Sequence, residues 1–78
     1  MDAQRLSAGW LSDEMANALA AMCPPLQTSD VLHAAEELNA HATTPDVVVV
    51  DRLFRSDIDR VCLRNVITAL RALYDLRS

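Results

Sequence analysis

The fold is decided by residues 57–76, which read DIDRVCLRNVITALRALYDL. Apolar residues recur there at three- and four-residue spacing, which is the period of an α-helix. On a helical projection they form one wide apolar sector, which comprises Val61, Cys62, Leu63, Val66, Ile67, Ala69, Leu70, Ala72, Leu73, Tyr74 and Leu76. Ser56 is the expected N-cap of this helix, with Asp57 and Asp59 in its first turn.

This apolar sector is too wide for a single packing partner. A surface helix of a globular protein needs an apolar stripe of roughly 100°, and this sector is about twice as wide. We therefore expect the last helix to be covered on two sides. In so short a chain, the second cover is expected to come from another molecule.

The whole chain, residues 1–78, is expected to form a single helical domain in which residues 1–9 are a candidate frayed N-terminus. Seventy-eight residues lie near the lower end of what folds unaided. One glycine, three prolines and 51% hydrophobic residues favour an ordered, helical chain. No apolar stretch approaches the roughly 18 residues of a membrane span, so a cytoplasmic protein without a membrane partner is expected.

Two further helices are predicted ahead of the last one, separated by proline-marked turns. The first starts at residue 12 or 13, with Ser12 as N-cap, and ends before Pro24 and Pro25. The second starts near the three capping residues Thr28, Ser29 and Asp30 and runs to about Ala42. Its predicted inner face is formed by Val31, Leu32, Ala35 and Leu38.

Residues 45–55 are ambiguous between helix and strand. Val47–Val50 are four consecutive β-branched residues, which favour a strand, but no second such run exists for them to pair with. Thr44 and Pro45 look like the cap and first residue of a helix. We therefore predict a short buried helix, with an extended segment that pairs with its own copy as the alternative. The predicted fold is all-α: a small compact bundle of about four short helices, the last one longest.

The spacing of the two histidines suggests a metal site, but helix geometry argues against it. His33, Glu37 and His41 stand at i, i+4 and i+8, so the two histidines are about 12 Å apart along a helix axis. Zinc needs its nitrogen ligands at about 2 Å. An exposed helix face with a Glu37–His41 pair is expected instead, and no metal or cofactor is predicted.

Catalytic chemistry is not predicted either. The two cysteines, Cys23 and Cys62, have neither a CxxC arrangement nor metal-ligand spacing. Reduced thiols are expected, with Cys62 inert on the apolar face of the last helix; one disulfide between them is the alternative. A single glycine, Gly9, excludes a glycine-rich phosphate loop. No residue is a candidate nucleophile or general base, so the protein is not expected to be an enzyme.

Charge argues against nucleic acid as the main partner. The net charge is −4, and like charge repels both nucleic acid and anionic lipid. The arginines concentrate in the C-terminal half, where Arg60, Arg64 and Arg71 share one stripe of the last helix. A helix-turn-helix transcriptional regulator that contacts DNA through this stripe is the alternative function.

The predicted function is a small acidic protein that binds another protein as a regulator, an antagonist (inhibitor) or an adaptor, and that forms a homodimer. The predicted interface residues on the last helix are Leu63, Val66, Ile67, Leu70 and Tyr74, with Asn65 fixing the register by pairing with its symmetry mate. An external partner is expected on one of two surfaces, the acidic residues Asp13, Glu14, Glu36 and Glu37 or an apolar patch around Trp10 and Leu11.

Overall fold

The structure is a computed structural model that describes residues 10–76. Its four helices follow in the order α1 (Asp13–Ala21), α2 (Thr28–Ala40), α3 (Asp46–Leu53) and α4 (Arg60–Leu76). The predicted all-α class is confirmed, since residues 10–76 contain no strand, and α4 is the longest helix at 17 residues. The expectation of a frayed N-terminus falls on residues 1–9, which lie outside the described part of the chain.

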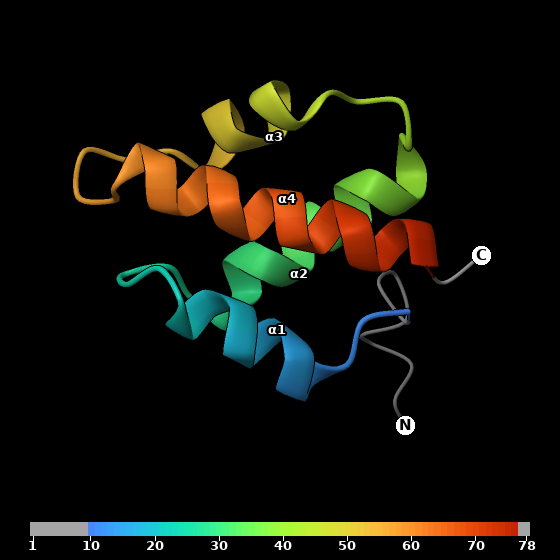
Figure 1. Ribbon diagram of the computed structural model, residues 1–78, viewed down its shortest axis with the longest axis horizontal. Coiled ribbons are helices and arrows are strands. Elements are labelled where there is room, and N and C mark those ends of the chain that lie inside the picture. The colour runs from blue at the N-terminus through green and yellow to red at the C-terminus, as the bar shows by residue number, and fades with distance from the viewer. Residues whose placement is uncertain (1–9, 77–78) are drawn as a thin grey trace.

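Helix α4 crosses the front of the molecule between α1 and α3, and α2 lies behind it (Figure 1). All four helices contribute to one core, together with the loops on either side of α1 and ahead of α4. Alanine takes several core positions on α1 and α2, where it allows these two helices to approach closely: Ala16, Ala20, Ala34 and Ala35. The bundle therefore combines a tightly packed α1–α2 pair with the larger apolar side chains of α4.

The start of α1 agrees with the prediction from sequence. Ser12 is in an extended conformation, and its hydroxyl accepts a hydrogen bond from the Met15 amide at 3.1 Å. Asp13 and Glu14 follow in the first turn, where negative charge complements the helix dipole. The helix ends at Ala21, shortly before Pro24 and Pro25.

The caps of α2 and α4 differ from the prediction. Gln27 caps α2, ahead of the predicted run of capping residues, and its backbone N–H donates to the Asp30 carboxylate at 2.9 Å. At α4 the cap is Asp59, whose Oδ1 accepts from the amides of Val61 at 2.8 Å and Cys62 at 3.2 Å. The prediction of Ser56 is wrong because Asp59 lies one turn later and has the same capping chemistry. Its carboxylate therefore precedes the helix instead of lying in the first turn.

The valine run forms the helix α3, as predicted, and it is only partly buried. Val49 and Val50 face the core, whereas Val47 is 58% exposed. Pro45 is the N-cap of this helix, whereas Thr44 was the predicted cap. The Thr44 hydroxyl instead donates to Glu37 of α2 at 3.4 Å. The apolar face of a two-turn helix is enough to hold it against α2 and α4, so packing overrides the strand propensity of valine.

Arg71 of α4 fastens the start of α3 to the bundle. Its Nε donates to the Asp46 carboxylate at 2.9 Å, and its terminal nitrogens donate to the backbone carbonyls of Ala42, at 2.7 Å, and of Thr44. One planar guanidinium thus contacts three acceptors in the segment that joins α2 to α3, a geometry that a lysine cannot reproduce.

Candidate protein-binding surface

Most of the interface that the sequence predicts on α4 lies inside the protein's own core. The side chains of Leu63, Val66, Ile67 and Leu70 are at most 1% exposed, so they are not available to a second molecule. Tyr74 is half-buried and Asn65 is exposed. Of the six predicted interface residues, these two reach the surface.

A different side of α4 remains open to solvent. Five positions within one narrow sector of the helix form it, and we call them the outer stripe: Val61, Asn65, Ala69, Ala72 and Leu76. Val61 is 69% exposed and Leu76 is 80% exposed, while Ala69 is half-buried. Within residues 10–76, the core therefore covers the wide apolar sector of α4 on one side only, and the outer stripe is the part that these residues leave exposed.

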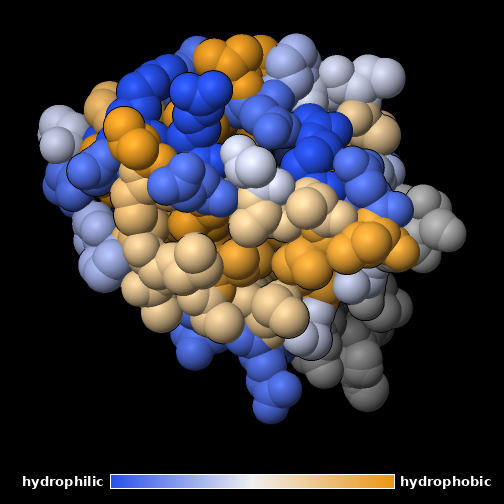
Figure 2. Space-filling model, viewed as in Figure 1, coloured by the Kyte–Doolittle hydropathy of each residue, from blue (hydrophilic) through white to orange (hydrophobic). Residues whose placement is uncertain are grey.

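Helix α1 extends this apolar surface. Met15, Ala18 and Met22 recur at i, i+3 and i+7 and are all exposed, with Met22 at 57%. Met22 lies beside the start of α4, because its carbonyl accepts a hydrogen bond from the Cys62 thiol at 3.1 Å. Figure 2 shows apolar surface continuing from α4 onto α1. The outer stripe, Met15 and Ala18 of α1, and Met22, the C-cap of α1, are together called the α1–α4 face.

Sequence reasoning did not assign the α1 residues to this surface. Met15, Ala18 and Met22 belong to the same apolar period as the buried residues of α1, and the core takes Ala16, Leu19 and Ala20 instead. A signal was present in the sequence, since the methionine positions form a second stripe, offset from the alanine-rich one. Small residues mark the side of a helix that packs most closely against a neighbour.

The apolar patch predicted around Trp10 and Leu11 is largely used within the protein. Leu11 is buried in the core. Trp10 is half-buried, and its ring contacts Tyr74 edge-on at a centroid distance of 5.3 Å. Its indole nitrogen is buried and has no hydrogen-bond acceptor within the described chain. Trp10 thus packs against the end of α4, which leaves little of this patch for a partner.

The predicted acidic surface is divided between two helices. Asp13 and Glu14 are exposed in the first turn of α1, and Glu36 and Glu37 are half-buried on α2. Glu37 forms an ion pair with Arg52 of α3. The Glu37 carboxylate therefore helps to hold α3 against α2.

The arginine stripe is mainly structural. Arg71 contacts the start of α3, as described above. Arg60 forms an ion pair with Asp51, and its guanidinium lies over the Phe54 ring at 5.0 Å. Arg64 is exposed and has no ion pair within residues 10–76. One unpaired arginine gives little support to DNA binding, which needs several cations facing phosphates together.

A shallow hollow of about 330 Å³ opens between α3 and α4. Its lining combines both charges with apolar side chains: Asp46, Val47, Val50, Arg60, Arg64 and Thr68. Two of its charged groups are neutralised, since Asp46 binds Arg71 and Arg60 binds Asp51. The hollow therefore lacks the convergent polar groups of a small-molecule site.

Within residues 10–76 the histidines do not join a cluster of ligating groups large enough for a metal ion. His33 lies on the exposed side of α2 next to Glu37 and Arg52, and His41 ends the helix. Within residues 10–76, no cluster of three or more histidine, cysteine, aspartate or glutamate side chains could hold a metal ion.

The two thiols are neighbours, although 38 residues separate them in the sequence. Cys23 is fully buried at the turn after α1, and Cys62 is half-buried in the first turn of α4. The Cys62 thiol donates to the Met22 carbonyl at 3.1 Å, and the Cys23 thiol donates to the Asp59 carbonyl at 4.0 Å. The expected burial of Cys62 is therefore only partial, and the fully buried thiol is that of Cys23.

Burial raises the pKa of Cys23 to about 12, with further contributions from a hydrogen bond with the Cys62 thiol and from the charges of Cys62 and Asp59. An unfolded cysteine has a pKa of about 8.5. The raised native value stabilises the fold fully below about pH 8.5, and this stabilisation is lost as the pH rises toward the native pKa.

We expect the free energy of unfolding to fall with pH above about 8.5, by up to about 1.4 kcal/mol per pH unit, because the unfolded chain loses the Cys23 proton before the native protein does. Urea titrations in a reducing buffer at several pH values would measure this slope. The matched variant Cys23→Ala should show a shallower slope over the same range. Equal slopes would contradict a raised pKa at this residue.

None of the helices within residues 10–76 is long and apolar enough to cross a bilayer. No protein-family model, curated protein or solved structure matches this chain. The α1–α4 face is therefore the candidate site, on the strength of its own geometry.

Proposed function

We propose that this protein is a small protein-binding module without catalytic chemistry, which acts as a regulator, antagonist or adaptor and dimerises through its α1–α4 face. The observation that carries the proposal is the open outer stripe of α4, continuous with Met15, Ala18 and Met22 of α1. Scattered exposed apolar residues are ordinary, but a contiguous apolar face marks an interaction surface.

The spacing along α4 favours a second copy as the occupant. Large apolar residues stand at the two ends of the outer stripe, Val61 and Leu76, and small ones stand near its centre, Ala69 and Ala72. In an antiparallel pair of α4 helices, Val61 of one copy lies opposite Leu76 of the other. Small residues at the centre allow the two helix axes to approach to roughly 8 Å.

The polar border of the stripe supports the same arrangement. Arg64 and Asp75 lie on one edge of the stripe, toward its opposite ends. In the antiparallel pair, Arg64 of each copy lies beside Asp75 of the other. Exposed ion pairs contribute at most about 1 kcal/mol each, so these pairs select the orientation while apolar contact supplies the affinity. Asn65 then lies opposite Ala72 and does not meet its own symmetry mate.

Light scattering coupled to size exclusion tests the dimer directly. The chain has a mass of 8.6 kDa, so a dimer has about twice that mass. We expect the dimer in the unmodified protein and a monomer in the variant Ala72→Glu, whose dissociation constant should rise at least about tenfold, because a carboxylate at the centre of the interface is desolvated. Ala40→Glu, on an exposed position of α2, is the matched control and should remain dimeric.

A charge exchange tests the orientation separately. Arg64→Glu and Asp75→Arg should each weaken the dimer, and the double variant should recover it. A chain that remains monomeric at the highest attainable concentration would contradict the homodimer. In that case the α1–α4 face would have to serve a different protein.

A further inference from the structure

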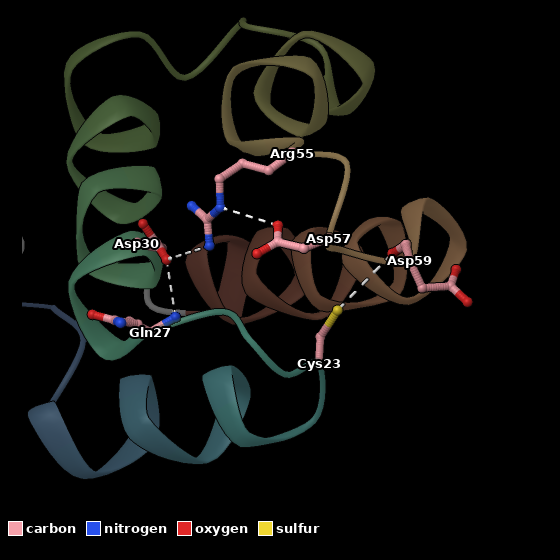
Figure 3. A network of polar contacts seen from close by, with 6 residues as sticks. All are labelled: Cys23, Gln27, Asp30, Arg55, Asp57 and Asp59. Carbon is pink, nitrogen blue, oxygen red and sulfur yellow. Dashed lines mark hydrogen bonds and ion pairs between the residues drawn. The ribbon is translucent and has the colours of Figure 1, made fainter.

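Cys23 and Cys62 lie next to each other, where the turn after α1 meets the start of α4. Each thiol contacts the backbone beside the other cysteine. The Cys62 thiol donates to the carbonyl of Met22, which precedes Cys23. The Cys23 thiol donates to the carbonyl of Asp59, one turn before Cys62 (Figure 3). These two crossed contacts, each from one thiol to the backbone beside the other, place the two cysteines next to each other.

A polar network holds the backbone on both sides of this junction. The Asp30 carboxylate accepts from the Gln27 amide at 2.9 Å and pairs with Arg55 at 3.7 Å, and Arg55 also pairs with Asp57 at 3.5 Å (Figure 3). The loop ahead of α4 is thus tied to the start of α2, directly after the turn that carries Cys23. Both cysteines are held in place before any reaction occurs, which lowers the entropic cost of joining them.

Unequal access to solvent sets the order of reaction. Cys62 is half-buried, so a small reagent can reach its sulfur, whereas Cys23 is fully buried. A reagent attached to Cys62 would then lie within reach of Cys23 alone, because the chain contains no third cysteine. Cys62 is the attacking thiol in this arrangement, and Cys23 is the resolving thiol.

We propose that Cys23 and Cys62 form an intramolecular disulfide by exchange with a small-molecule disulfide such as oxidised glutathione. The Cys62 thiolate attacks one sulfur of the reagent, forms a mixed disulfide and releases one reduced thiol. Cys23 then loses its proton to solvent, and the resulting thiolate attacks the Cys62 sulfur, closes the protein disulfide and releases the second reduced thiol. This second step is the slower one at neutral pH, because the pKa of Cys23 is raised. The protein loses two electrons and two protons, and the reagent takes up both.

Mass spectrometry after exposure of the reduced, folded protein to excess oxidised glutathione tests this proposal. After quenching with an alkylating reagent, we expect most chains to have lost two hydrogen atoms and to carry no adduct. Digestion after arginine should then yield residues 6–52 joined to residues 61–64. Chains that stop with glutathione on one or both cysteines, or that link to a second chain, would overturn the proposal.

Single variants test the order of reaction. Cys23→Ala should keep one glutathione on Cys62, because the resolving thiol is missing. Cys62→Ala should react at least tenfold more slowly, because only the buried thiol remains. Equal reactivity of the two variants would contradict the assigned order. Circular dichroism shows whether each variant retains its helices, and the result with the unmodified chain does not depend on either variant.

Discussion

Replacing Leu63 with alanine is expected to lower the free energy of unfolding by about 2–5 kcal/mol. Leu63 is fully buried on α4, where its side chain fills the space between the helices. The substitution removes apolar contact and leaves a cavity that the short helices of so small a protein can close only in part. A domain of this size has little stability in reserve, so a large share of the molecules should unfold at moderate temperature.

Val61→Ala is the matched control, since it shortens an apolar side chain on the same helix only two residues away. Val61 is 69% exposed, and its loss should change the free energy of unfolding by no more than about 0.5 kcal/mol. Urea denaturation at a protein concentration that keeps the chain monomeric measures both values. If Leu63→Ala and Val61→Ala lowered the free energy of unfolding by similar amounts, the assignment of the inner and outer sides of α4 would be wrong.

Replacing Arg71 with methionine is expected to cost about 2 kcal/mol of stability. Methionine retains the apolar contact of the unbranched stem, but it removes every hydrogen bond to Asp46 and to the carbonyls of Ala42 and Thr44. Part of this loss is recovered because Asp46 and the carbonyls are near enough to solvent to bind water. The stability of Arg71→Lys should lie between that of the unmodified protein and that of Arg71→Met. Lysine retains the positive charge but lacks the planar guanidinium group.

The effect should be concentrated in α3. Amide hydrogen exchange in residues 46–53 should become faster in Arg71→Met, while the core of α4 should retain more of its protection. Arg64→Met is the control, since Arg64 is exposed on the same helix and lacks an ion pair within residues 10–76. At a protein concentration that keeps the chain monomeric, the stability of this variant should differ by no more than about 0.5 kcal/mol. A similar loss in both variants would contradict the structural role given to Arg71.

The N-caps of α1 and α4 differ in whether the local sequence predicts them. Ser12 is preceded by no competing residue at the right spacing, and its cap is predictable from the sequence. At the last helix two candidates compete, Ser56 and Asp59, and both have suitable side chains. The choice depends on how far the loop must extend before α4 can lie against the core, where Ile58 is buried. The required length of this loop depends on the packing of the whole bundle, so the local sequence does not determine it.

The candidate surface was predictable only in part. The width of the apolar sector on α4 predicted more apolar surface than one partner covers, and Val61 and Leu76 are indeed exposed. It did not indicate which part faces inward, and four of the six predicted interface residues are core residues. The contribution of Met15 and Met22 depends on how α1 is rotated against α2, which the buried alanines Ala16 and Ala20 decide.

The number and class of the helices could be predicted from the sequence, because helical periodicity, capping residues and prolines act over a few residues. Tertiary structure decided which half of the α4 sector became core, since that choice depends on the simultaneous packing of α1, α2 and α3 against it. It also decided that Cys23 and Cys62 meet. Spacing along the chain contains no information about such contacts, because only the closure of the whole bundle brings the turn after α1 to the start of α4.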